Sequence, residues 1–103
     1  MVAEINCGPD MRMTLLKEEN GICCVITVED KEGSLRCQLG SLCSVVNGMR
    51  YHFAGDNVLC TLSLADSMVA VDVQLGNGSS ISALVPVDEY RSALLRLEQT
   101  ATP

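Results

Sequence analysis

The chain has 103 residues and a formal net charge of −6, with 48% apolar and 19% charged residues. Its length allows one domain (residues 1–103) with one hydrophobic core, and its apolar fraction excludes an intrinsically disordered chain. The acidic charge repels both the phosphate backbone of nucleic acids and an anionic membrane surface, so neither is expected as a partner, while a basic protein partner is weakly favoured through electrostatic steering.

Alternation of apolar and polar residues, which is typical of strands, runs through the first half of the chain. Residues 1–9, punctuated by Cys7-Gly8-Pro9-Asp10, are expected to form a lead-in segment. Alternation predicts strands at 11–15, 22–28, 35–39, 42–46 and 49–53, with charged turns at 17–21 and 29–33. Asn47-Gly48 between the last two runs predicts a hairpin, because both central residues of a type I′ turn need positive φ.

The second half of the chain continues this alternation and then changes its period. Further strands are predicted at 58–64, 69–75 and 81–85, with turns at 54–57, 65–67 and 76–80. Pro86 favours an extended conformation in the residue before it. Residues 87–99 are then predicted to form a helix, because Tyr90, Leu94 and Leu97 make an apolar stripe at helical spacing.

The order of these elements predicts a mainly β protein, α+β by content. We expect an antiparallel β-meander of about seven or eight short strands over residues 10–85, rolled into a barrel or bent sheet, with one C-terminal helix packed on it and a frayed tail at 100–103. This order resembles the pleckstrin-homology superfold, although the tryptophan of the eukaryotic family's C-terminal helix is absent here. The alternative is a single strongly bent sheet whose exposed edges would be completed by dimerisation.

The six cysteines bear on the cellular compartment. An even number of cysteines in so short a chain would indicate disulfides if the protein were secreted. The first ten residues have no basic start followed by an apolar run, and no stretch approaches the ~20 apolar residues of a membrane span. We therefore expect a cytoplasmic protein, without membrane association, whose cysteines are reduced and mostly fill the core.

A polar strip on the outer face of the predicted sheet is the main candidate site. By parity it holds Arg12, Arg36, Gln38, Arg50, His52, Thr61, Ser63, Asp72 and Gln74. If Arg36, Arg50 and His52 lie on neighbouring strands, they would bind a carboxylate or phosphate of a small anionic ligand. The simpler interpretation is an ordinary solvated face of an antiparallel sheet.

Catalytic and metal sites find less support in the sequence. His52 is the only histidine, and Cys23 and Cys43 share its outward parity, but no local signature accompanies a Cys–His pair. Cys23 and Cys24 are adjacent and would point to opposite faces of a strand, and no C-x-x-C pattern exists, so no metal or cofactor is expected. The loop at 76–80 lacks the Lys-Ser/Thr of a phosphate-binding loop, and the helix-start carboxylates at 88–89 are explained by the helix dipole.

Three functional hypotheses follow. The first is a non-enzymatic binding or interaction protein, such as an adaptor, an inhibitor or immunity protein, or a chaperone-like protein, that acts through a sheet face, a strand edge or the helix on a basic partner or on a second copy of itself. The second is a small-ligand binder with a cavity lined by Met and Cys and an anchor at Arg36, Arg50 or His52. The third, and the least favoured, is an enzyme with a cysteine nucleophile.

Overall fold

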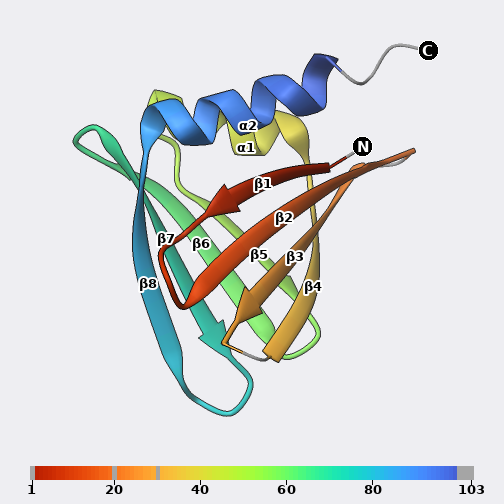
Figure 1. The fold of residues 1–103 in the computed structure, drawn as a ribbon, viewed down its shortest axis with the longest axis vertical. Coiled ribbons are helices and arrows are strands. Elements are labelled where there is room, and N and C mark those ends of the chain that lie inside the picture. The colour runs from red at the N-terminus through yellow and green to blue at the C-terminus, as the bar shows by residue number, and fades with distance from the viewer. Residues whose placement is uncertain (1, 20, 30, 100–103) are drawn as a thin grey trace.

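The computed structural model describes residues 2–19, 21–29 and 31–99, which form one antiparallel sheet and a helical layer (Figure 1). The sheet has eight strands in the order β1 to β8, and each strand pairs with its neighbours in the sequence. The strands are β1 (Val2–Asn6), β2 (Met11–Glu18), β3 (Gly21–Val28), β4 (Lys31–Cys37), β5 (Tyr51–Gly55), β6 (Val58–Ala65), β7 (Met68–Leu75) and β8 (Ser80–Pro86). The predicted β-meander, in the form of a nearly closed barrel, is thereby confirmed.

Helical segments occur at two places in the chain. Helix α1 (Leu39–Ser44) and the short 3-10 turn η1 (Val45–Asn47) lie between β4 and β5, and helix α2 (Val87–Gln99) follows β8. Helix α2 confirms the predicted C-terminal helix and lies across one end of the rolled sheet, with α1 beneath it (Figure 1). The expected frayed tail at 100–103 lies outside the described residues.

The strand registers explain why one side of the sheet is apolar. Met13 of β2 lies opposite Ile26 of β3, and Leu15 lies opposite Cys24. All four side chains are buried. Because successive side chains in a strand point to opposite faces, the same alternation repeats from strand to strand and fills the barrel with aliphatic and sulfur-containing side chains.

Three local predictions were wrong. Residues 1–9 are not only a lead-in, because Val2–Asn6 form β1 and pair along their whole length with β2. The run 42–46 belongs to α1 and η1 rather than to a strand. Gly48 has φ +95° and ends the 3-10 turn, so Asn47-Gly48 is a helix terminus and not a hairpin turn. Met49, which lies just before β5, is 61% exposed.

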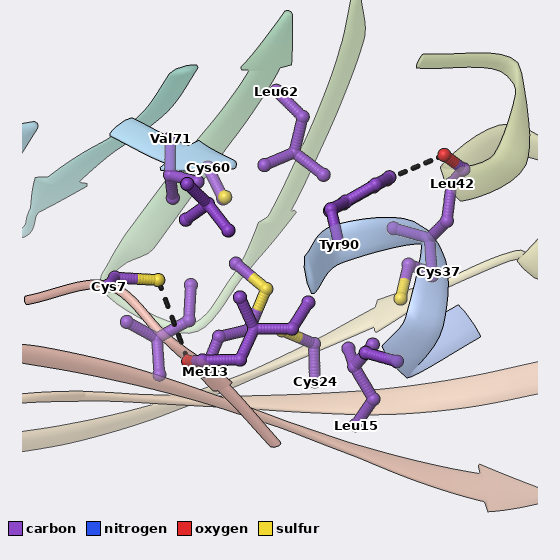
Figure 2. Close-up of a cluster of buried hydrophobic side chains, with 14 of the residues drawn as sticks. Cys7, Met13, Leu15, Cys24, Cys37, Leu42, Cys60, Leu62, Val71 and Tyr90 are labelled. Atoms are coloured by element: carbon purple, nitrogen blue, oxygen red, sulfur yellow. Dashed lines mark hydrogen bonds between the residues drawn. The ribbon is translucent and has the colours of Figure 1, made fainter. Parts of the chain in front are cut away.

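Helix α2 is held to α1 by a buried tyrosine. Tyr90, Ala93, Leu94 and Leu97 are buried on one face of α2, as the predicted stripe requires. The Tyr90 hydroxyl donates a hydrogen bond to the carbonyl oxygen of Leu42 in α1 at 2.5 Å (Figure 2). This bond fixes the two helices to each other over the end of the barrel.

The junction between β4 and β5 divides the sheet into two four-stranded halves. These strands share a single paired position, Leu35 with Gly55, whereas β5 pairs with β6 at five positions. A Cβ atom at Gly55 would overlap the carbonyl oxygen of Ser34. Glycine at position 55 is therefore required for β5 to approach β4 closely enough to continue the sheet.

We predict that Gly55→Ala destabilises the protein by about 1–3 kcal/mol, because the added methyl group must push β5 away from the Ser34 backbone. Urea unfolding at neutral pH measures this change. Gly40→Ala is the matched control, since Gly40 lies in α1 with open space around its Cβ position. That control is expected to leave the free energy of unfolding equal or slightly higher; equal effects of the two substitutions would contradict the proposed close approach.

We also predict that Tyr90→Phe lowers the free energy of unfolding by about 0.5–1.5 kcal/mol through loss of one buried hydrogen bond. Tyr51→Phe provides the comparison. The Tyr51 hydroxyl accepts a hydrogen bond from the Gln38 backbone N–H at 3.2 Å in an exposed position, where water replaces the lost partner. Urea unfolding of the two variants should give a clearly larger loss for Tyr90→Phe, and the reverse order would refute the role of the buried bond.

Candidate functional site

Arg36, the first residue of the predicted anion site, makes an ion pair away from the other two. It lies on β4, and its guanidinium Nη1 is 3.4 Å from Oε1 of Glu18 on β2. The Arg36 side chain is 78% exposed, so solvent screens this pair and it contributes little to stability. The pair orients Arg36 across β3 toward the N-terminal half of the sheet.

His52 is oriented toward the opposite half of the sheet. Its Nδ1 lies 2.9 Å from Oγ1 of Thr61 on β6. Arg50 precedes β5 and is exposed. Within the described parts of the chain, no hydrogen bond or ion pair connects any two of Arg36, Arg50 and His52. The sparse pairing of β4 with β5 explains why Arg36 and His52 find partners on separate halves of the sheet.

The rest of the predicted polar strip is spread over both halves of the sheet. Arg12, Asp72 and Gln74 are exposed on their strands, and Thr61 and Ser63 are half-buried. Gln38 has left the strand and precedes the first residue of α1. The arginines belong to the N-terminal half of the sheet and to the β4–β5 connection, whereas the strip's residues on β6 and β7 belong to the C-terminal half.

Five of the six cysteine thiols have a raised pKa, which disfavours the thiolate form. Burial raises the pKa of Cys7 to about 11 and the pKa of Cys60 to about 12, and it also raises the pKa of Cys24. Cys43 lies on α1 and not on a strand with outward parity, and its Sγ is 3.7 Å from Oε1 of Glu98. Burial and this carboxylate raise the pKa of Cys43. A raised pKa keeps a thiol protonated and weakly nucleophilic at neutral pH.

The barrel interior is packed with apolar side chains (Figure 2). Apart from Tyr90 with its hydroxyl, the buried set among the described residues contains no polar or charged side chain. No arginine or histidine therefore reaches the interior as a ligand anchor. The same part of the chain holds no group of three or more His, Cys, Asp or Glu residues placed to bind a metal ion.

A surface cleft of about 440 Å³ lies between β1 and α2. Its lining residues are Glu4, Asn6, Asp88, Glu89, Ser92 and Arg96. Three of the six are carboxylates on a chain that is acidic overall. This region repels anions and acidic partners.

The outer face of β6, β7 and β8 is almost free of charge. We call this surface the β6–β8 face. It consists of Leu59, Thr61, Ser63, Ala65, Met68, Ala70, Asp72, Gln74, Ser80, Ser82, Leu84 and Pro86. Asp72 is the only charged member, and its Oδ1 accepts a hydrogen bond from the Ser82 hydroxyl at 2.5 Å. Leu84 is 59% exposed and Leu59 is 40% exposed, so two large apolar side chains stand on this face.

Strand β8 carries an unpaired backbone edge beside this face. The Leu75 N–H donates a hydrogen bond to the Ser79 carbonyl oxygen at 2.8 Å, which sets the phase of the ladder between β7 and β8. In an antiparallel ladder, hydrogen-bonded pairs recur at every second residue. The backbone groups of Ser80, Ser82 and Leu84 therefore point away from β7. Within the described ranges, no backbone hydrogen bond joins β8 to a strand other than β7.

This edge lacks the features that normally protect an edge strand. Native edges are usually blocked by charged side chains, prolines, bulges or short strand length. Strand β8 has seven residues with no Asp, Glu, Lys or Arg, and its one proline, Pro86, stands at the end. Its backbone is therefore open to pairing with a further strand.

The other free edge of the sheet, on β1, is protected. The Cys7 N–H donates to the Met11 carbonyl oxygen at 3.1 Å, and by the same alternation the backbone of Glu4 points away from β2. Strand β1 has only five residues, and α2 packs against it with Asp88 and Glu89 beside Glu4. Charge, short length and the helix together block this edge.

The β8 edge was not among the predicted sites, because those sites were defined by side chains that carry chemistry. The usable signal was the absence of charge over residues 80–86 at the end of a meander. That absence acquires meaning only when β8 is known to be the last strand of the sheet, because the same uncharged run in a central strand would be paired on both sides.

Comparison with known proteins gave no relative: no family model, no curated protein and no solved structure matches the chain. In the part of the chain that the structure describes, no helix has the length and apolar character needed to cross a membrane.

The buried thiols predict a pH dependence of stability. The pKa of Cys7 in the folded protein is about 11 and that of Cys37 about 12, against 9.0 for the free thiol. The unfolded chain releases these protons first, so the stability is fully present below pH 9 and is lost as pH rises toward 11 and 12. Each such thiol should lower the free energy of unfolding by about 1.4 kcal/mol per pH unit in this window.

Urea unfolding with a non-thiol reductant at pH 7.5, 9 and 10 measures the slope. Cys60→Ala should make the fall of the unfolding free energy with pH less steep by an amount that corresponds to about one bound proton. The reason is that it removes one thiol whose pKa is about 12 in the folded state. Replacement of the exposed Met49 by Ala is the control and should leave the slope unchanged. A free energy of unfolding that rises with pH in this window would contradict the assignment.

Proposed function

We propose that the protein is a non-enzymatic interaction protein that binds an extended protein segment by adding it as a strand to the free edge of β8. The observation that carries this proposal is the unpaired, uncharged backbone edge at Ser80, Ser82 and Leu84. Strand addition uses main-chain hydrogen bonds for affinity, so it needs no catalytic or charged side chains.

The β6–β8 face supplies the side-chain contacts for such a segment. Alternate residues of an added strand would lie on the outer surface next to Ser82 and Leu84. Leu84 offers the apolar contact, since more than half of its side chain is exposed. The backbone edge therefore contributes affinity, and Leu84 contributes selectivity for an apolar residue of the partner.

Two other functions lack comparable support. A small anionic ligand would need Arg36 and His52 to converge, but Arg36 pairs with Glu18 and His52 contacts Thr61. A cysteine enzyme would need a thiol with a lowered pKa, whereas burial raises the pKa of Cys7, Cys24, Cys37 and Cys60.

We also place the protein in a reducing compartment, the cytoplasm. The six cysteines are free, and four of them are buried in an apolar core. Buried thiols of this kind serve as small apolar side chains, and reducing conditions keep them in that form.

Site-specific photo-crosslinking tests the interaction site. A photo-reactive phenylalanine analogue at position 82 should give adducts with one definite protein in the native host, whereas the same group at the exposed position 12 on β2 should not. The captured protein is then purified and its affinity measured. Leu84→Lys should weaken binding by at least about tenfold, because it places a charge at the pairing edge.

Leu59→Lys is the matched control for this measurement. It introduces the same charge at another exposed leucine of the β6–β8 face, two strands or about 10 Å from the free edge. Binding should change less than about threefold in this variant. Equal adducts from positions 12 and 82, or equal losses in the two lysine variants, would refute binding at the β8 edge.

A further inference from the structure

Strand β8 is able to pair with a copy of itself. Two identical antiparallel strands are related by a two-fold axis, which is the symmetry of most protein dimers. Directly opposite residues of an antiparallel pair point to the same face. Residues of one β8 whose side chains lie on the outer face must therefore lie opposite outer-face residues of the other β8. This requirement is met only when the two-fold axis passes through a residue, and not when it passes between two residues.

A two-fold axis at Ala83 allows every residue of β8 to pair with a residue of the second copy. It places Ser82 opposite Leu84 of the second copy and Ser80 opposite Pro86, so residues 80–86 pair from end to end. The outward-pointing N–H and C=O groups of Ser80, Ser82 and Leu84 then form about six main-chain hydrogen bonds. Pro86 has no N–H, so each Ser80–Pro86 pair makes one bond, from the Ser80 N–H to the Pro86 carbonyl oxygen, instead of two.

The side chains at such an axis are compatible with close approach. Ala83 would meet Ala83 of the second copy at a pair without mutual hydrogen bonds, where the Cα atoms of opposite strands come within about 4.5 Å. On the outer surface the exposed Leu84 would lie against Ser82 of the second copy. The two C-terminal half-sheets, β5–β8 of each copy, would become one continuous sheet.

Charge distinguishes β8 from β1, the other free edge of the sheet. Each chain carries a net charge of −6, so two copies repel each other over most approaches. Strand β8 has no charged residue, and the neighbouring Asp72 is hydrogen-bonded to Ser82. Self-pairing of β1 would instead bring Glu4, Asp88 and Glu89 of each copy together.

We infer that the strand added to β8 is β8 of a second copy, and that the protein forms a two-fold symmetric dimer about Ala83. This inference rests on the proposed function, because it names the partner at the same edge. The contact involves one strand and its flanking side chains, which is smaller than a standard protein–protein interface. A reversible dimer with a dissociation constant of about 1–100 µM is therefore expected.

Sedimentation velocity and native mass spectrometry of the reduced full chain at 1–500 µM test the inference. The wild-type protein should shift from 11.0 kDa toward twice that mass as concentration rises. Ser82→Pro and Leu84→Lys should each raise the dissociation constant at least tenfold. Circular dichroism verifies that both variants fold.

Two matched variants test whether the loss of dimerisation is specific to the β8 edge or follows from any added proline or lysine. Glu4→Pro removes an equivalent outward-pointing N–H from the other free edge, and Leu59→Lys adds the same charge away from β8. Both should dimerise like the wild type. Dimerisation that survives Ser82→Pro and Leu84→Lys unchanged would overturn the inference, since the contact would then lie elsewhere.

Salt dependence distinguishes a second copy from a basic partner. Because two chains of charge −6 repel each other, rising salt should tighten the dimer by screening that repulsion. Binding to a basic protein would weaken with salt. A dimer that dissociates between 50 and 300 mM salt would contradict an interface centred on the uncharged β8.

Amide hydrogen exchange locates the contact. In the dimer, the N–H groups of Ser82 and Leu84 should become at least tenfold more protected as concentration rises, while Ala83, whose N–H points toward β7, should be protected at every concentration. A protein that stays monomeric throughout would overturn the second-copy inference. The proposed function would then be judged separately, by photo-crosslinking from position 82 to a different protein.

Discussion

Backbone hydrogen bonding at the two ends of a meander is the constraint on which the rest of this structure depends. Each strand pairs only with its sequence neighbours, so β1 and β8 both keep one unpaired edge unless the barrel closes between them. The chain protects these edges unequally. Strand β1 is short, carries Glu4 and lies against α2, whereas β8 is longer, uncharged and directly followed by the helix.

The helical layer and the core follow from the same rolled sheet. One face of every strand must be covered, and α2 covers one end of the barrel with Tyr90, Leu94 and Leu97. The hydrogen bond from Tyr90 to Leu42 then ties α1 to that helix. The interior is filled in this way with apolar side chains.

If the partner at β8 is a second copy, the acidic charge of the remaining surface helps to restrict the contact between copies to β8. Net charge keeps copies apart except where no charge is present, and the region without charge coincides with the unpaired backbone at Ser82 and Leu84. Repulsion elsewhere and pairing at one edge together would favour a closed dimer over open-ended aggregation, because the described strands of each copy leave one edge, that of β8, unprotected.

Sequence alone determined the strand periodicity, the inward faces and the C-terminal helix. Alternation at 22–28 and 69–75 is local and survives in the structure because every second residue must enter the core. Only tertiary structure decided that 42–46 is helical, since a short apolar run fits either conformation and the requirement to bury Leu42 and Val45 in the core selects one. Tertiary structure also decided that Arg36 and His52 diverge and that β8 stands at an open edge, because strand neighbours and edges are long-range properties that no local pattern encodes.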